Sequence, residues 1–283
     1  MEGPLVSIIV PVYNAENHIV RCVESIRRQT YENIEILVLN DGSTDNSMHL
    51  CEMLARVDDR IVLVDKENSG VSGTRNLGMK LAKGKYLQFV DADDTVQPYA
   101  TELLVQKAEE HQTDLVIAHY NRIQPLKEPQ DAEEAAKKPA IRQIERVQTS
   151  GYLMEGYMDK ESFAAHLMQE PASFYYGVMW NKLYRTDLVR AHEDVVCSEE
   201  MKWSEDLYFN LSYIRYAERF YALSTPIYNY YNNPGSAVHN MDPIATATTR
   251  LTLYNYYKDL YEHMGLYEEF KDLIFKFIFT VGK

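Results

Sequence analysis

Short apolar runs recur through the first 120 residues, and each of them ends in a polar segment. The runs occupy residues 6–12, 34–39, 61–64, 86–90 and 115–118. Continuous runs of this length predict strands buried on both faces of a parallel sheet. Between them apolar residues return every three or four positions, as in residues 16–28, which predicts amphipathic helices. Because strand and helix alternate, we expect a doubly wound, mostly parallel α/β sheet with flanking helices.

The pattern changes after residue 123. Residues 124–150 contain three prolines and a run of Glu, Lys, Gln and Ala, which favours a mobile insertion or linker, or a partly ordered hairpin. Farther on, helical spacing predominates, with one alternating strand expected at 221–231. The sequence therefore predicts an α/β half at 1–123, an insertion at 124–150 and a mainly helical C-terminal lobe at 151–283.

One predicted strand ends abruptly on acidic residues. The apolar run at 86–90 leads directly into Asp91, Ala92, Asp93 and Asp94. Open α/β sheets bind ligands at the carboxyl ends of their strands. Mg²⁺ and Mn²⁺ take oxygen ligands, and one or two carboxylates commonly hold them together with phosphate oxygens of a substrate. The run therefore indicates a divalent cation site, the alternative being a polar turn in which Asp94 caps the next helix.

Charge and missing motifs narrow the choice of ligand. The net charge of −13 argues against nucleic-acid binding, since affinity for phosphate backbones needs clustered Lys and Arg. No Gly-x-Gly-x-x-Gly follows the first run, and no Gly-x-x-x-x-Gly-Lys occurs anywhere. A nucleotide, if one is bound, must be held by other means.

The cysteines and the ends of the chain bear on the compartment. Cys22, Cys51 and Cys197 have no metal-binding spacing and fit a reducing cytoplasm, with the first two expected in buried helix positions. No signal peptide and no run of about 20 apolar residues is present, so we expect no membrane span. The aromatic stretch 273–279 could pack in the core or make a peripheral contact with a membrane or a partner.

Four polar motifs after the predicted strands carry a resemblance to a known family. They are Pro11-Val12-Tyr13-Asn14, Asn40-Asp41-Gly42-Ser43-Thr44-Asp45, Arg75-Asn76 with Gly78, and Asp91-Ala92-Asp93-Asp94. In order and spacing, from residue 5 to about 120, they resemble the nucleotide-diphospho-sugar domain, called GT-A, of the family 2 glycosyltransferases. Residues 180–184 and Glu205-Asp206 are similar to the family's acceptor-side segment and Glu-Asp pair, although Ser204 stands where glycine is more usual.

The resemblance implies a reaction. The chain is expected to transfer one sugar, with inversion, from a UDP-sugar to a glycan or a lipid-linked saccharide acceptor, with Mn²⁺ or Mg²⁺ as cofactor. The Gln-x-x-Arg-Trp motif of processive synthases is absent, so transfer is expected to be non-processive.

The resemblance also assigns roles to the donor side. It implies that Asp93 binds the metal and that Asp91 contacts the ribose or a metal-bound water, with Ala92 between them. Asp41 matches the acid that pairs with the uracil N3 hydrogen, and Arg75 matches an arginine near the phosphates. The residues implied at the border of the base pocket are Pro11, Tyr13 and Glu16.

On the acceptor side the resemblance implies a catalytic base. An inverting displacement needs one carboxylate to take the proton of the acceptor hydroxyl. That base would be Asp206, with Glu205 beside it, unless both acids only complement a helix dipole. His239 could complete the metal shell, or be an ordinary surface histidine. Trp180 and the nearby tyrosines could stack on acceptor sugars or pack the second lobe.

Two other functions stay open as alternatives. A nucleotidyltransferase also joins an α/β sheet to metal-binding acids, but would be expected to have a basic, glycine-rich loop where Pro11 to Asn14 stand. A catalytically silent glycan-binding or assembly protein could keep the same fold. The identity of the sugar, the acceptor and the linkage cannot be read from these motifs.

Overall fold

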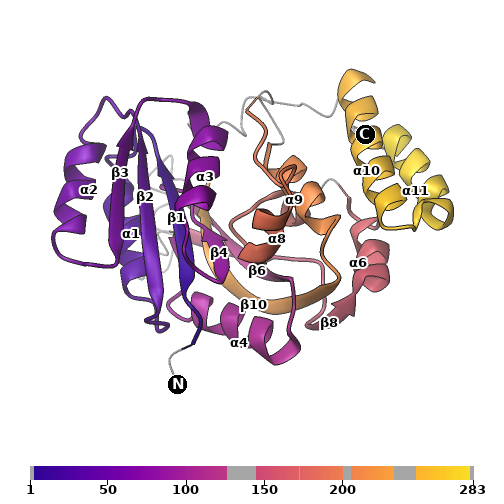
Figure 1. Cartoon of the computed structure of the whole chain (residues 1–283), viewed down its shortest axis with the longest axis horizontal. Coiled ribbons are helices and arrows are strands. Elements are labelled where there is room, and N and C mark those ends of the chain that lie inside the picture. Colours follow the sequence, from indigo (N-terminus) through magenta and orange to yellow (C-terminus); the bar gives the residue numbers. More distant parts are fainter. Residues whose placement is uncertain (1–2, 126–144, 172, 200–204, 233–246, 281–283) are drawn as a thin grey trace, which may run out of the picture.

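The computed structural model describes residues 3–125, 145–171, 173–199, 205–232 and 247–280. His239 and Ser204 lie outside these residues. The described strands form one mixed sheet whose main path runs β3-β2-β1-β4-β9-β6-β10-β5, with helices packed around it (Figure 1). The predicted α/β class with flanking helices and a helical C-terminal region is confirmed.

The first half of the sheet is parallel, as its unbroken apolar runs predict. Its strands are β1 (Val6–Val12), β2 (Ile34–Asp41), β3 (Ile61–Lys66) and β4 (Tyr86–Phe89). The helices α1 (Ile19–Arg27) and α2 (Ser47–Ala55) lie on one side of these strands and α3 (Gly70–Leu81) lies on the other (Figure 1). Cys22 and Cys51 are buried on these helices, as predicted. All four strands point their carboxyl ends toward the same edge.

The second half of the sheet takes strands from both sides of the predicted insertion. β9 (Lys182–Arg185) lies antiparallel between β4 and β6 (Leu115–Pro125), and β6 runs parallel to β10 (Arg219–Tyr231). The two-residue strand β5 (Thr95–Val96) pairs with β10, and α4 (Ala100–His111) connects β5 to β6. The division at residues 124–150 stays a prediction, but the sheet itself continues across it.

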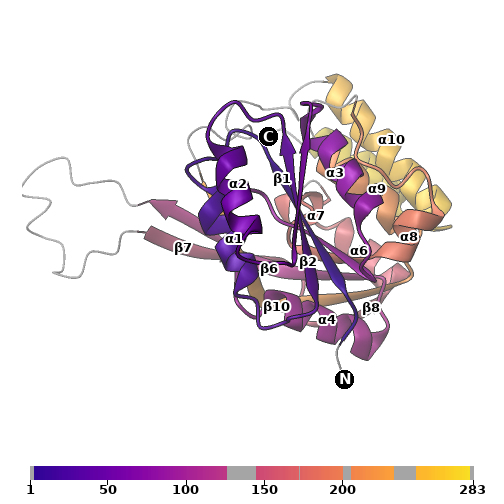
Figure 2. The same cartoon turned by 60° about the vertical axis from the view of Figure 1, so that its left-hand side comes forward.

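Two further strands extend the sheet. β7 (Glu145–Ser150) pairs antiparallel with β6, and the two project together as a ribbon (Figure 2). β8 (Gly156–Asp159) pairs with β10. The ends of the predicted insertion therefore form the hairpin that was one of its two interpretations, while residues 126–144 lie outside the described part.

Helices make up most of the rest. They are α6 (Lys160–Leu167), α7 (Phe174–Gly177), α8 (Thr186–Ala191), α9 (Glu205–Ile214), α10 (Ala247–His263) and α11 (Tyr267–Thr280). In the aromatic stretch 273–279 on α11, Ile274 and Phe277 are buried, which supports the core-packing interpretation for that face, while Leu273 and Phe275 are exposed. No helix in the described ranges is long and apolar enough to cross a membrane.

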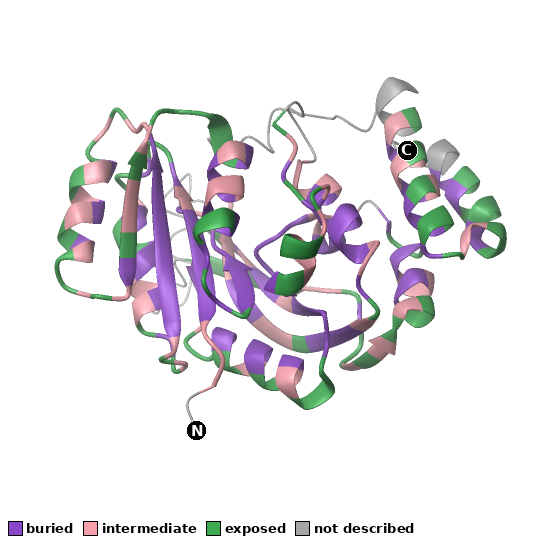
Figure 3. Cartoon of the chain, in the orientation of Figure 1, coloured by how far each residue is buried: buried purple, intermediate pink, exposed green. Residues whose placement is uncertain are grey.

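Buried residues concentrate on the strands and on the inner faces of the helices (Figure 3). Trp180, Tyr175 and Tyr176 are each at most 2% exposed, and Trp180 stacks on Tyr228 with ring centroids 4.2 Å apart. These aromatic side chains pack the core, so the alternative in which they stack on acceptor sugars is wrong for this arrangement.

Candidate active site

The three acids after β4 take two different orientations. Asp94 is 1% exposed; its Oδ2 accepts a hydrogen bond from the Tyr228 hydroxyl at 2.8 Å and its Oδ1 accepts one from the Tyr231 amide at 2.8 Å. Burial, followed by the charges of Asp93 and Asp91, raises the pKa of Asp94 well above its usual value. Asp94 thus anchors this turn to β10 and does not cap α4, whose N-cap is Tyr99, so the capping role that the polar-turn alternative gave to Asp94 is wrong.

Asp91 and Asp93 form the remaining pair of carboxylates. Both raise the pKa of Asp94, so their charges lie together at the end of β4. The Tyr228 hydroxyl accepts a hydrogen bond from the Asp91 amide at 3.1 Å, and the Asp93 carbonyl accepts one from Arg21 at 2.7 Å. The backbone of this turn is therefore held from β10 and from α1.

Arg75 on α3 forms ion pairs with two acids from distant parts of the chain, Asp91 and Asp206. It is 4% exposed; its Nη2 donates to Asp91 Oδ1 at 2.9 Å and its Nη1 donates to Asp206 Oδ1 at 2.5 Å. Among the described residues, no acceptor reaches its buried Nε. Gly78, one turn along α3, lets the helix approach β1 and β2 closely, because a Cβ there would lie 2.6 Å from Ile9. The packing of α3 thus fixes where Arg75 projects.

Asp206 sits in the first turn of α9, with a side chain 21% exposed. Burial raises the pKa of Asp206 to about 6, while Arg75 and the Met179 amide act to lower it and Asp91 and Glu205 add to the rise. A carboxylate with a pKa near the working pH can both lose and accept a proton readily. The structure therefore places Asp206 close enough to Glu205 and Asp91 for their charges to raise its pKa.

Asp41 lies at the end of β2, where its carboxylate organises the next loop. It is 3% exposed and accepts hydrogen bonds from the amides of Ser69, at 2.8 Å, and Gly70, at 3.0 Å, and from Lys66. Burial alone would raise the pKa of Asp41, but these hydrogen bonds bring it below its usual value. Asp41 is therefore a charged hydrogen-bond acceptor at the predicted place, and both of its carboxylate oxygens already accept hydrogen bonds from the backbone.

The loops after β1 and β2 are tied to each other. The Asn14 amide donates to Ser43 Oγ at 3.1 Å, and the Asn14 side chain accepts from the Thr44 amide at 2.8 Å. Glu16 accepts from the Asn46 amide at 2.9 Å. Tyr13 is 54% exposed beside these contacts. Of the residues predicted to border the base pocket, Glu16 thus uses its carboxylate to hold the loop after β2, and the ring of Tyr13 is exposed.

A divalent cation fits the acids at the end of β4 in its donor chemistry. The described residues contain no group of three or more His, Cys, Asp or Glu side chains arranged to hold a metal, and His239 lies outside them. The neighbouring Asp91 and Asp93 supply two hard oxygen donors, the usual protein share of a Mg²⁺ or Mn²⁺ site completed by substrate phosphates. The metal roles of these acids stay predictions.

Several residues behind the site lie outside every motif recognised in the sequence. Tyr228 binds the Asp91 amide and the Asp94 carboxylate, and the buried Asn210 on α9 donates to the Asp206 carbonyl. The alternating pattern at 221–231 could have placed Tyr228 on an inward face, but nothing local in the sequence connects β10 to the turn after β4. Such contacts depend on the tertiary fold.

Comparison with known proteins identifies the class. A family model described as "Glycosyl transferase family 2" matches residues 7–183. The chain belongs to the family 2 glycosyltransferases.

Its relatives include proteins of several bacteria. The chain is 35% identical to EpsJ of Bacillus subtilis, an uncharacterized glycosyltransferase, over 82% of this chain and 62% of EpsJ. It is 33% identical to the glycosyltransferase GlyA of Streptococcus pneumoniae, over 82% of this chain and 31% of GlyA. The chain thus spans about three fifths or less of these relatives.

Solved structures share the fold at lower identity. The structure of S. aureus TarS 1-349 in complex with UDP-GlcNAc has a TM-score of 0.69 and 21% identity, covering 96% of this chain and 73% of TarS. The mannosyltransferase PcManGT of Pyrobaculum calidifontis, in complex with GDP-Man and Mn²⁺, has a TM-score of 0.59 and 14% identity, covering 94% of this chain and 70% of that protein.

Proposed function

We propose that this chain catalyses the metal-dependent, inverting transfer of a sugar from a UDP-sugar to a hydroxyl of a glycan or of a lipid-linked saccharide. The observation that carries the proposal is the Arg75 bridge, which joins Asp91 on the donor side to Asp206 at the start of α9. An inverting displacement needs these two parts on either side of one sugar: a group that stabilises the leaving diphosphate and a base for the attacking hydroxyl.

On the donor side, Asp93 and Asp91 are proposed to hold Mn²⁺ or Mg²⁺, which would neutralise charge developing on the leaving diphosphate. Arg75 is proposed to add a fixed positive charge beside the phosphates, with its buried Nε still free of a described acceptor. Asp41 is proposed to accept the uracil N3 hydrogen, while Pro11, Tyr13 and Glu16 border the base. That TarS was solved with UDP-GlcNAc, and PcManGT with GDP-Man and Mn²⁺, supports a nucleotide-sugar donor.

On the acceptor side, Asp206 is proposed to take the proton from the attacking hydroxyl. A pKa near 6 leaves it mostly ionised at neutral pH and still basic enough to accept a proton. Glu205, the preceding residue, is proposed to support the charge of the site. We propose the cytoplasm as the place of the reaction, and the acceptor as a saccharide whose identity is set by contacts outside this constellation.

The test is nucleotide release. We expect the protein to release UDP from a UDP-sugar when Mn²⁺ is present, and faster when an acceptor saccharide is added. GDP-mannose, tested in parallel, decides whether the donor nucleotide is uridine. A nucleotidyltransferase would instead consume a nucleoside triphosphate and release pyrophosphate, and a silent glycan-binding protein would release nothing.

The metal role has a separate test in Asp93→Ala. If Asp93 holds the cation, UDP affinity measured by calorimetry in Mn²⁺ should fall about 10-fold or more, because the diphosphate loses its bridging charge. Asp59→Ala, which removes an exposed acid at a distant turn, is the matched control and should bind as the wild type does. Unchanged UDP affinity in Asp93→Ala would rule out this residue as the ligand.

A further inference from the structure

Lys182, the first residue of β9, carries a buried amino group that the proposed reaction has not used. Its side chain is 0% exposed. The Nζ donates to the Asn181 Oδ1 at 2.8 Å, to the Tyr175 carbonyl at 3.1 Å and to the Val178 carbonyl. An ammonium group has three hydrogens to donate, so the three oxygens match its protonated form. All three acceptors are uncharged.

Such an arrangement is costly for folding alone. Taking an ammonium group out of water costs several kcal/mol, and a well-packed apolar side chain of similar volume is often as stable or more so. No described carboxylate lies within ion-pair distance of the Lys182 Nζ. Burial lowers the pKa of Lys182 well below its ordinary value, and the charge of Asp206 acts to raise it, so the match of three acceptor oxygens to three N–H hydrogens is what favours the protonated form. The charge that Lys182 faces at longer range is therefore that of the proposed base.

The oxygens around Lys182 are connected to the start of α9. The Nδ2 of Asn210 donates to the Gly177 carbonyl at 2.8 Å, to the Val178 carbonyl at 3.3 Å and to the Asp206 carbonyl at 2.7 Å. Val178 thus accepts from Lys182 and from Asn210 at once. The next amide along the chain, that of Met179, favours the charged form of the Asp206 side chain. The turn at residues 175–179 therefore links Lys182 to Asp206 through a continuous buried network.

We propose that Lys182 is a positioning residue for Asp206: its buried ammonium fixes the 175–179 turn against the start of α9 and holds Asp206 as a carboxylate. The inference rests on the proposed function of Asp206 as the base. Lys182 itself touches neither donor nor acceptor in this scheme. It supplies a second positive charge in addition to Arg75.

The effect of losing the Lys182 charge on the pKa of Asp206 depends on the other groups that act on Asp206. Arg75 on α3 favours its carboxylate, whereas Asp91 at the end of β4 and Glu205 on α9 disfavour it. Cys197 and Tyr184 also face Asp206, and burial raises the pKa of both, which keeps them uncharged near neutral pH. Without Lys182, Arg75 would be left to oppose two acids, so the pKa of Asp206 should rise.

Two variants and one control test the inference. Lys182→Gln keeps two N–H donors for the carbonyl oxygens but removes the charge, and Lys182→Met removes both. The control is Arg185→Gln, which removes a partly buried cation three positions along β9, where it pairs with Asp114. Circular dichroism and thermal unfolding report which variants fold, and Lys182→Gln is the more conservative of the two.

The kinetic readout is the pH profile of donor turnover. We expect the acid limb of kcat for Lys182→Gln to move up by about half a unit to one unit, so that kcat falls by about 3-fold to 10-fold well below pH 6 and by no more than about 2-fold at pH 7, with a nearly unchanged KM for the UDP-sugar. Arg185→Gln should lower thermal stability but leave the acid limb in place. An equal loss of kcat at every pH in Lys182→Gln would show a merely structural role and overturn the inference.

A second readout does not depend on turnover. With ¹³C-labelled aspartate, the carboxyl signal of Asp206 can be assigned from the spectrum of Asp206→Asn and followed through a titration. We expect it to titrate at higher pH in Lys182→Gln than in the wild type, and an unchanged midpoint would overturn the inference. If the wild-type protein transferred no sugar, the proposed function would fail while this titration still decided whether Lys182 acts on Asp206.

Discussion

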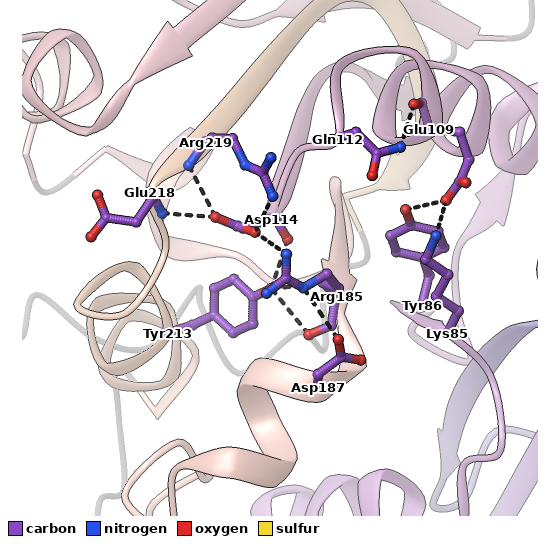
Figure 4. Close-up of polar contacts among 10 residues, drawn as sticks. All are labelled: Lys85, Tyr86, Glu109, Gln112, Asp114, Arg185, Asp187, Tyr213, Glu218 and Arg219. Atoms are coloured by element: carbon purple, nitrogen blue, oxygen red, sulfur yellow. Dashed lines mark hydrogen bonds and ion pairs between the residues drawn. The ribbon is translucent and has the colours of Figure 1, made fainter.

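Two buried clusters of arginine and aspartate lie at opposite ends of the strands, and they are built differently. In the first, Asp114 precedes β6, and its side chain is 5% exposed. Its Oδ2 accepts from the amides of Glu218 and Arg219, at 2.8 and 3.0 Å, and its Oδ1 accepts from Arg185 at 2.6 Å (Figure 4). The Tyr213 hydroxyl donates to the Asp114 carbonyl at 2.6 Å. This cluster, here called the Asp114 cluster, ties β6, β9, β10 and α9 together.

The second cluster contains Arg75, Asp91 and Asp206, at the carboxyl end of β4. Its two acids are more exposed, with side chains 29% and 21% accessible, although Arg75 itself is as deeply buried as Asp114. Two carboxylates share one guanidinium, and burial raises the pKa of Asp206 to about 6. Backbone amides complete the charges of the Asp114 cluster, whereas the Arg75 cluster leaves carboxylate surface accessible. We therefore expect the first cluster to serve stability and, under the proposed function, the second to serve the reaction.

The largest expected difference between the clusters is in turnover. Asp206→Asn keeps the shape of the side chain but cannot accept a proton, so transfer should fall by about 100-fold or more while UDP-sugar affinity changes little. Glu205→Gln should be milder, since that acid only supports the site. Initial rates and calorimetry on each variant measure both effects.

The control for this prediction is Asp194→Asn. Asp194 also pairs with an arginine, Arg215, at 2.9 Å, but it lies outside the site. This variant should turn over as the wild type does. If Asp206→Asn retained near-normal turnover, Asp206 would not be the base, and the Arg75 cluster would be a structural ion pair like the other.

The sequence predicted one side of this comparison better than the other. The acids after β4, Arg75 and Asp206 could all be named, because each belongs to a short motif that resembles one of the family 2 glycosyltransferases. The contact between Arg75 and Asp206 could not be read, because 131 residues separate them. It depends on how α3 and α9 pack against the same sheet.

The Asp114 cluster had no signal in the sequence. Asp114 is a single acid before a strand, and its main partners are backbone amides, which every residue has. β9, which carries Arg185 and Lys182, is only four residues long and was not predicted as a strand. Short central strands are defined by their neighbours in the sheet, so their own pattern is too brief to show them.

The second prediction concerns stability, to which the Asp114 cluster should contribute more than the Arg75 cluster does. Asp114→Asn removes a buried charge from beside Arg185 while keeping its shape, and breaking a buried ion pair by removing one partner costs about 3 kcal/mol or more. We expect the free energy of unfolding to fall by about that amount, with kcat unchanged in the fraction that stays folded. Urea unfolding and initial rates measure the two quantities. A loss of kcat with intact stability would mean that the Asp114 cluster also serves the reaction.

The smallest expected effect is a pH dependence of stability that belongs to Asp206 alone. Its pKa is about 6 in the folded protein and near the ordinary value of 3.8 in the unfolded chain, so the folded protein favours the protonated form. Its contribution to stability is therefore fully present below about pH 3.8 and is lost as the pH rises through about 6. The two-unit rise corresponds to at most about 3 kcal/mol, and we expect roughly half of that because the side chain is 21% exposed.

Asp206→Asn provides the comparison, because its amide is neutral at every pH. The free energy of unfolding of this variant, relative to the wild type, should increase by about 1 to 2 kcal/mol between about pH 4 and about pH 7. Urea unfolding of both proteins at several pH values in this window measures the difference, and everything that titrates equally in the two proteins cancels. A difference that stayed flat across the window would place the pKa of Asp206 near its ordinary value. The Asp206 carboxylate would then be as stable in the folded protein as in water. The Arg75 cluster would no longer differ from the Asp114 cluster in having a carboxylate that changes its charge near neutral pH.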